Sequence, residues 1–275
     1  LIPLYLICKR HKLSNAAVIL FSLCYVLLPS MANGCFFFLH ENKFLTPLIL
    51  WLAFALEKNK WIPSVIFTLL LLAVKEDAPV YAAVLGLYFI VSRRNISKGA
   101  LVFVLSIIYF ITVSYFMSKY GLGTMSYRYD NFIYDGSGSL FTVIKAVILN
   151  PIYTVHEAFD EEKIKFILQM LVPLAFMPLM IKKPSRIILL IPFILLNLMS
   201  DYTYQHNINF QYTYGSAAFL FYLMILNYQD MKPGFRCKVL AVAATSSIFM
   251  FMCNTYYRTS GYESYKTDKN SGAKA

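Results

Sequence analysis

The feature that most constrains this chain is the alternation of long apolar runs with short polar connections. The runs, with approximate edges, are 1–8, 15–39, 44–56, 61–74, 78–92, 99–118, 166–181, 187–200, 212–228 and 239–254. A helix needs about 20 mainly apolar residues to cross a bilayer. Only 14% of the residues are charged, whereas soluble domains have about a quarter. We therefore predict an all-α, polytopic transmembrane helical bundle with about nine complete spans and a partial first one.

The first run differs from the others because its eight residues are too few to span a bilayer. It shows no initiator Met, no basic n-region and no small-residue cleavage site, so it is not a signal peptide. We expect these residues to end a truncated helix, which makes the chain an N-terminally truncated piece.

The basic residues are concentrated in every second connection. The connections 9–14, 57–60, 93–98, 182–186 and 229–238 hold 14 of the 25 Lys and Arg residues but only two of the 14 acids, Glu57 and Asp230. The positive-inside rule places these connections in the cytoplasm. We expect a multi-pass protein of the bacterial cytoplasmic membrane. Its extracytoplasmic segments are then 31–43, 75–77, 119–165, 201–211 and the tail 255–275.

The net charge of +11 does not indicate a nucleic-acid-binding protein, because the basic residues form short clusters between apolar runs. The five cysteines form no CxxC pair. Cys8, Cys24 and Cys253 lie within predicted spans, and Cys35 and Cys237 lie on opposite sides of the predicted topology. Neither a disulfide framework nor a zinc site is therefore predicted. The partner class that this composition does predict is membrane lipid.

Residues 1–254 are predicted to form one transmembrane helical domain, followed by a polar tail, 255–275, that we expect to be disordered. The longest connection of this domain is the extracytoplasmic loop 119–165. Within it, residues 139–149 are apolar apart from one Lys. This pattern predicts a short amphipathic helix at the membrane interface, which Pro151 ends or kinks.

Four polar clusters lie at extracytoplasmic ends of the apolar runs. They are Leu39 to Lys43, Lys75 to Asp77, Tyr127 to Asp130, and Ser200 to Asn207. Between Lys60 and Lys75 there are 14 apolar or neutral residues, about 21 Å of helix against a hydrocarbon core of about 30 Å. The acids at the ends of such short helices would line a water-filled recess in the outer half of the membrane, where charges are usually functional. The alternative is an ordinary interfacial turn, with snorkelling and local thinning of the bilayer.

Two cations in these clusters are candidate phosphate ligands. Arg128 has the better geometry, because a guanidinium binds two oxygens at once; its alternative is a solvated loop charge. Lys75 is the second candidate, and its alternative is pairing with a neighbouring acid. Metal binding is not predicted from the spacing of the outer histidines, which are His40, His156 and His206.

The four clusters lie in motifs that resemble the predicted membrane-protein family called domain of unknown function 2079. The motifs are FLHENKF (38–44), VKEDAPVYAAVLGLYF (74–89), GTMSYRYDNFIYDGSGSLF (123–141) and LIPFILLNLMSDYTYQHNINFQYTYG (190–215). The resemblance covers about residues 10–225. That family in turn resembles the GT-C glycosyltransferases, so the resemblance implies a GT-C-like fold. It also implies transfer of a sugar from a polyprenyl-phosphate carrier to a glycan or lipid acceptor outside the cytoplasm.

Two departures from the family pattern limit what the resemblance implies. An Asp often stands two places before the His of the HEN motif, where this chain has Phe38. GT-C enzymes also carry their key acid in the first outer loop, which would precede this chain. The resemblance therefore implies that the catalytic base lies upstream and that this piece alone is inactive.

The chemistry of the proposed transfer assigns roles to the candidate residues. A carboxylate base must take the proton of the acceptor hydroxyl, and the candidates are Glu76, Asp77 and Asp201. The leaving lipid phosphate needs cations or a divalent metal to stabilise its charge. No metal-ligand motif is present, so the sequence does not decide whether the protein uses a metal cofactor. The candidate substrate-binding residues are Lys75, Arg128, His40, Glu41, Tyr204, Gln205 and His206.

Two other functions remain open from the sequence. A transporter or flippase would use the same acids as a proton or cation relay. Helices broken by Gly or Pro in matching halves would favour transport, and Pro173 and Pro178 are candidates for one kink. The third function is a non-enzymatic membrane subunit whose polar clusters are merely interfacial.

Overall fold

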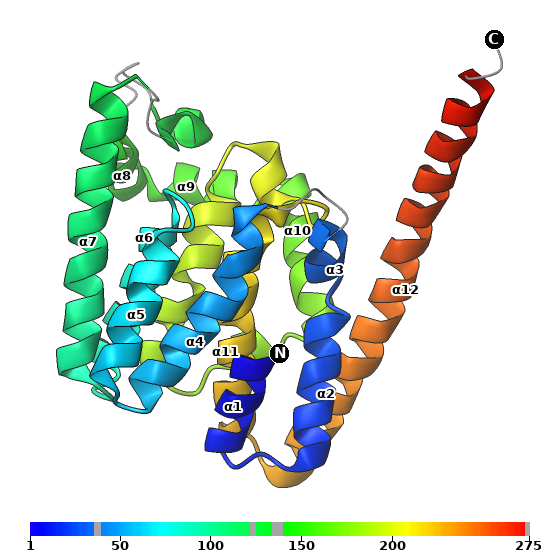
Figure 1. The fold of residues 1–275 in the computed structure, drawn as a ribbon, viewed down its shortest axis with the longest axis horizontal. Helices are drawn as coiled ribbons and strands as arrows, with labels where there is room; N and C mark the ends of the chain where they lie inside the picture. The colour runs from blue at the N-terminus through cyan, green and yellow to red at the C-terminus, as the bar shows by residue number, and fades with distance from the viewer. Residues whose placement is uncertain (36–39, 122–124, 134–139, 273–275) are drawn as a thin grey trace.

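The computed structural model describes residues 1–35, 40–121, 125–133 and 140–272, without the side chains of 125, 140, 141 and 255–272 (Figure 1). The first half contains α1 (Ile2–Arg10), α2 (Asn15–Val26), α3 (Pro29–Cys35), η1 (Glu41–Phe44), α4 (Leu45–Glu57), α5 (Trp61–Leu72), α6 (Ala78–Val91), α7 (Ile96–Lys119) and η2 (Met125–Phe132). The second half contains α8 (Leu140–Leu149), α9 (Pro151–Ala158), α10 (Glu161–Leu171), η3 (Val172–Leu174), η4 (Met177–Leu179), η5 (Pro184–Leu190), η6 (Phe193–Leu198), η7 (Thr203–His206), η8 (Gln211–Thr213), α11 (Tyr214–Asp230) and α12 (Pro233–Gly272). The regular structure within the described residues is all helical, which confirms the predicted class.

Helix α11 forms the centre of the bundle. Every residue from Tyr214 to Tyr228 is buried, as expected for a helix that is apolar on all sides. Helix α4 and the segments η4 and η5 pack against it, while α12 packs on α2. Helices α7 and α12 lie at opposite edges of the bundle (Figure 1). Most of the α7 surface is exposed, so this helix is positioned to face lipid.

Fewer described helices are long enough to cross a membrane than the nine complete spans predicted from the sequence. Two described helices are long and apolar enough to cross a membrane, Ile96–Lys119 and Pro233–Asn254. A third would be the pair α2 and α3, which is bent by 49°. Helices α5 and α6 are apolar but shorter. The nine complete spans therefore remain a prediction.

The predicted run 166–181 is not one straight helix. Helix α10 ends at Leu171, and two short 3₁₀ turns follow, with Ala175 and Phe176 at φ of 48° and 52°. The cause is Pro173 and Pro178, which lack an N–H and cannot continue a helix. The run 187–200 likewise consists of a 3₁₀ turn and a π-helical segment instead of a regular α-helix.

Side chains from neighbouring helices donate hydrogen bonds to the carbonyl groups of the broken segment. Asn227 Nδ2 donates to the carbonyls of Met177 and Pro178, at 3.0 and 2.9 Å. The hydroxyls of Ser246 and Ser247 donate to the carbonyls of Val172 and Pro173. Irregular backbone is tolerated inside a membrane protein where its polar groups are satisfied in this way.

The predicted loop 119–165 contains several helical segments. Residues 125–132 form η2, and α8 covers 140–149, close to the short helix predicted for 139–149. Helix α9 begins at Pro151, where proline is tolerated because the first N–H groups of a helix have no partner. Residues 122–124 and 134–139 lie outside the described part. At the C-terminus α12 continues to Gly272, although no side chain after residue 254 is described, and the predicted disorder of the tail stays a prediction.

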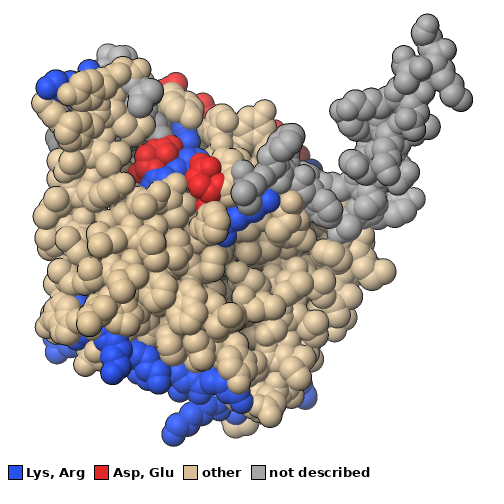
Figure 2. All heavy atoms as spheres, viewed as in Figure 1, with Lys and Arg blue, Asp and Glu red and all other residues tan. Residues whose placement is uncertain are grey.

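The bundle has a basic end and an acidic end. The basic end, at the bottom of Figure 1, is formed by the turns after α1, α4, α6 and α11. On the face in Figure 2, basic side chains line this lower edge, and acids appear near the upper end. At the acidic end, the connection between α5 and α6 stops well below the top of α7 (Figure 1). Which end faces the cytoplasm stays a prediction.

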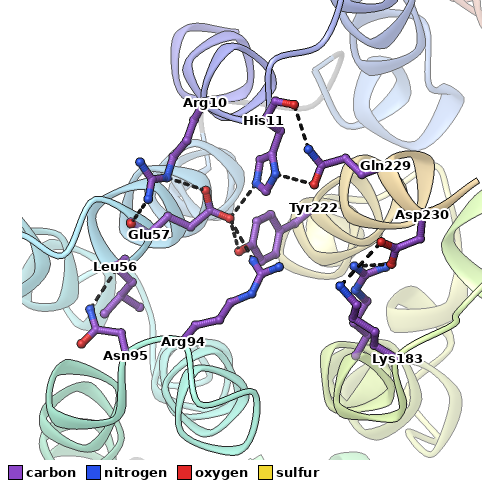
Figure 3. A network of polar contacts seen from close by, with 11 residues as sticks. Arg10, His11, Leu56, Glu57, Arg94, Asn95, Lys183, Tyr222, Gln229 and Asp230 are labelled. Atoms are coloured by element: carbon purple, nitrogen blue, oxygen red, sulfur yellow. Dashed lines mark hydrogen bonds and ion pairs between the residues drawn. The ribbon is translucent and has the colours of Figure 1, made fainter.

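The two acids of the basic end are both paired with basic groups (Figure 3). The side chain of Glu57 is 4% exposed, and its carboxylate lies 2.8 Å from His11 Nε2, 3.2 Å from Arg10 Nε and 3.5 Å from Arg94 Nη1. Tyr222 also donates to the Glu57 carboxylate, at 2.7 Å. A second carboxylate, that of Asp230, pairs with Arg186 at 2.6 Å and with Lys183 at 3.6 Å.

Candidate functional site

The connection between α5 and α6 is a tight turn that presents the charged triplet Lys75 to Asp77. Asp77 occupies the N-cap position of α6, and Pro79 follows within the first turn, where proline is tolerated. The Asp77 carboxylate makes no capping hydrogen bond to its own helix. It is directed instead toward Arg128, which comes from η2, about 50 residues later in the chain.

Arg128 lies between two carboxylates. Its Nη1 is 3.7 Å from Asp77 Oδ2, and its Nη2 is 3.6 Å from Glu76 Oε1. Arg128 and Asp77 are each 4% exposed, whereas Glu76 is half-buried. Gln205 completes the group, because its amide oxygen accepts from Arg128 Nη1 at 2.8 Å when its amide nitrogen donates to the Leu196 carbonyl. Buried charges are stable only when paired and hydrogen-bonded. We refer to Lys75, Glu76, Asp77, Arg128 and Gln205 as the Arg128 cluster.

Tyrosine rings surround the cations of the Arg128 cluster. The Arg128 guanidinium carbon lies 5.6 Å from the ring centres of Tyr127 and Tyr212, and 5.8 Å from that of Tyr202. Lys75 Nζ lies 4.8 Å from the Tyr212 ring centre. These distances fall within the range for cation–π attraction, so the rings help to hold both cations at this end.

Backbone contacts join η2 to the segment 200–206. The carbonyl of Arg128 accepts from the backbone N–H of Asp201 at 2.8 Å and from the hydroxyl of Ser200 at 3.1 Å. Asn197, fully buried in the π-helical segment η6, donates to the carbonyls of Gln205 and Tyr212. These bonds help to bring Arg128 and residues 205–212 to the same place, and the ion pairs with Glu76 and Asp77 add the turn between α5 and α6.

The structure brings together six of the residues predicted for the site. Besides the five members of the Arg128 cluster, His40 lies at the rim, with its ring 6.5 Å from that of Tyr212. Glu41 is near this rim but is more exposed and pairs with His40 at 3.3 Å. The site is therefore assembled from all four predicted polar clusters.

Three predicted residues do not face the Arg128 cluster in this structure. The side chain of Asp201 is exposed, and only its backbone contacts Arg128. Tyr204 is exposed and packs on Tyr202 and Phe210. His206 turns toward α10, where its Nε2 lies 3.7 Å from a carboxylate oxygen of Glu162.

Sequence reasoning missed two residues because they lie inside apolar runs. Tyr212 contacts both cations, and Asn197 holds the backbone around it. A signal for Asn197 was available, since an uncharged polar residue within the apolar run 187–200 needs buried partners. Its place in a π-helical segment is also typical of functional sites.

Burial affects the protonation of two groups outside the apolar spans. Burial raises the pKa of the Asp77 carboxyl above its ordinary value, although Lys75 and Arg128 oppose this shift. Burial, followed by the charge of Lys163, lowers the pKa of His206. Asp77 Oδ1 is buried without a hydrogen-bond partner. It is therefore an acceptor, or a donor when protonated, that a ligand can use.

The described residues contain no group of three or more His, Cys, Asp or Glu side chains placed to hold a metal ion. No curated protein and no solved structure matches the chain. A family model described as "Predicted membrane protein (DUF2079)" matches residues 1–269. Because this match spans nearly the whole chain, which is all-helical where described and has two helices of spanning length, the chain belongs to this family of predicted membrane proteins.

Proposed function

We propose that this protein is a GT-C-like glycosyltransferase, which moves a sugar from a polyprenyl-phosphate donor to a glycan or lipid acceptor on the extracytoplasmic face. The observation that carries the proposal is the Arg128 cluster, in which cations and carboxylates from two distant segments and the Gln205 amide from a third meet at the acidic end. Assembling buried charges is costly, and intramembrane charges usually mark a functional site.

The cluster offers the two kinds of group that the reaction needs. Lys75 is half-buried, and its ammonium is held over a tyrosine ring with no ion pair to a carboxylate at 4.0 Å or less among the described residues. It is the cation best placed to stabilise a leaving phosphate. The charge of Arg128 is already offset by Glu76 and Asp77, so we assign it to orienting these carboxylates.

The carboxylates of the cluster are the candidates for general base in this chain. Asp77 has a free, buried oxygen, whereas Glu76 is half-buried and open to an acceptor. Asp201, at the exposed rim, would position the acceptor.

The test compares donor consumption by membranes that contain the whole protein or its variants. We expect Asp77→Asn and Lys75→Gln each to lower transfer from polyprenyl-phosphate sugars by about 100-fold or more, the usual contribution of a positioned acid–base or electrostatic group. Glu161→Gln, an exposed acid on α10 away from the cluster, is the matched control. Normal transfer by both cluster variants at normal abundance would remove these residues from the site, and no transfer by the wild type with any donor would overturn the proposal.

The transport alternative receives less support from the arrangement of the broken helix. Transporters commonly use the freed carbonyls of a broken helix to coordinate ions. Here the carbonyls of Val172, Pro173, Met177 and Pro178 accept hydrogen bonds from Asn227, Ser246 and Ser247. The break therefore leaves these four oxygens occupied, and we rank transport below transfer.

A further inference from the structure

An apolar cavity of about 300 Å³ lies directly beside the Arg128 cluster. Helix α6 contributes one wall, with Val80 and Ala83, and α7 contributes the opposite wall, with Ile107 and Phe110. Helix α8 adds Ile144 at the mouth, where this side chain is 57% exposed. A volume of this size is at the lower end of the range for small-molecule sites.

The charged groups of the cavity come from two neighbouring residues. Its charged lining residues are Glu76 and Asp77, both members of the Arg128 cluster. Three residues with hydroxyl groups, Ser106, Ser114 and Tyr129, also line it. The hydroxyls of Ser106 and Tyr129 donate to the backbone carbonyls of Val102 and Leu195. Asp77 Oδ1, by contrast, has no partner although the residue is only 4% exposed. A buried polar atom without a partner needs an explanation, and a ligand group is one.

The walls of the cavity belong to a surface that is suited to lipid. Helix α7 is long and apolar enough to span a bilayer, and only 11% of its most apolar window is buried. Ile107 is 39% exposed at the same time as it lines the cavity. A ligand that enters from the side of α7 therefore approaches through apolar surface and meets charge only at its end.

We propose that this cavity holds the hydrocarbon chain of a phosphate-bearing membrane lipid, with the phosphate beside Lys75 and a headgroup donor on Asp77 Oδ1. The apolar walls match a hydrocarbon chain, and the cluster matches a headgroup with both a negative charge and a hydroxyl or ammonium group. This inference deepens the proposed function and rests on it for the identity of the headgroup. A lipid-linked sugar and a bilayer phospholipid share the required chemistry.

The experiment uses the full chain in nanodiscs of phosphatidylcholine and two photoreactive probes. One is a prenyl phosphate with a diazirine in its chain, and the other is phosphatidylglycerol with a diazirine in an acyl chain. We expect a probe to label peptides of α6 and α7, with competition by its unlabelled parent lipid. The probe that labels and is competed identifies the source of the occupant, because one is a phosphate monoester on a prenyl chain and the other a phosphate diester on acyl chains.

Two variants fill the cavity and one serves as the control. Ile144→Trp closes the mouth from an exposed position, and Ala83→Phe fills the middle. Each should reduce labelling of α6 and α7 about tenfold, which corresponds to a loss of about 1.4 kcal/mol. Ile108→Trp changes an exposed residue of α7 that does not line the cavity, so labelling should stay normal. Since Ile144 is exposed, the Ile144→Trp variant keeps the test valid if Ala83→Phe does not fold.

The outcomes separate the cavity from the proposed reaction. Labelling that spreads evenly over lipid-facing helices, or that Ile144→Trp leaves unchanged, overturns the cavity proposal. Cavity-dependent labelling in a protein that transfers no sugar supports the cavity and overturns the proposed function. Normal sugar transfer by folded Ile144→Trp and Ala83→Phe variants that lose the label overturns a lipid-linked sugar as the occupant and leaves the proposed function standing.

Discussion

At the scale of single residues, Glu57 joins elements that are far apart in the sequence. It lies at the end of α4 and contacts Arg10 and His11 at the end of α1 (Figure 3). It also contacts Arg94 in the turn between α6 and α7 and Tyr222 in α11. The sequence identified Glu57 as one of two acids among many bases. The network explains its presence, because a carboxylate there offsets several converging cations.

We predict that Glu57→Ala lowers the free energy of unfolding by about 3 kcal/mol, because it leaves partly exposed basic groups without the buried carboxylate that pairs with them. The value lies at the lower end of the range for buried pairs, since Arg10 and Arg94 are about one-third exposed. Thermal or denaturant unfolding in detergent measures the change, with Glu161→Gln as the surface control. Equal stability of the two variants would contradict a central role for the network.

His206 gives a prediction for the dependence of stability on pH. Its pKa is lowered by burial and then by Lys163, with Asp160 and Glu162 acting in the opposite direction. Because the unfolded chain binds this proton more readily, the free energy of unfolding should fall as the pH drops below about 6.5, the ordinary histidine value. Unfolding midpoints between pH 5 and 8 should therefore decline less in His206→Gln than in the wild type. An identical decline in both would assign the effect to other groups.

At the scale of elements, the contact between α6 and α7 depends on two glycines. A Cβ atom at Gly86 would lie 2.7 Å from the carbonyl oxygen of Gly99, and one at Gly99 would lie 2.8 Å from that of Gly86. Such close approach is typical of packing through small residues in membranes. The contact also holds together the two main walls of the apolar cavity.

We predict that Gly86→Ala destabilises the protein by about 1–3 kcal/mol, because backbone must move to relieve the clash. Gly234→Ala is the matched control, since a Cβ there meets no atom within 4 Å. Unfolding in detergent measures both. Separation of α6 from α7 should also weaken labelling of the cavity by the lipid probes, whereas Gly234→Ala should leave it unchanged.

At the scale of the whole molecule, the two ends differ in charge because the connections alternate between them. The predicted topology assigns the basic end to the cytoplasm. In a variant lacking the five native cysteines, Lys58→Cys should react with an impermeant maleimide only after the membrane is opened. Glu161→Cys, at the opposite end, should react in intact cells. Reversed labelling of the two positions would invert the topology and place the Arg128 cluster on the cytoplasmic side.

The predictability of the candidate site varied with the kind of residue. Lys75, Glu76, Asp77 and Arg128 were recognisable because charges at the ends of apolar runs are conspicuous in any sequence. Tyr212 and Asn197 were not recognised, since a tyrosine or an asparagine within an apolar run is compatible with simple packing. Asp201 resembled a site acid in sequence, yet the turn that fixes its backbone to Arg128 leaves its carboxylate exposed.

The sequence by itself determined the all-helical class, the membrane character, and the sorting of bases and acids between connections. These properties follow from local hydropathy and charge, which do not depend on how the helices pack. Pro173 and Pro178 predicted a kink in the run 166–181, but only the tertiary structure decided that the helix stops there. The carbonyls freed by the break are satisfied only where Asn227, Ser246 and Ser247 supply hydrogen bonds. The tertiary structure alone also decided that Arg128 meets Asp77 beside an apolar cavity, since contacts between distant segments depend on the packing of the whole bundle.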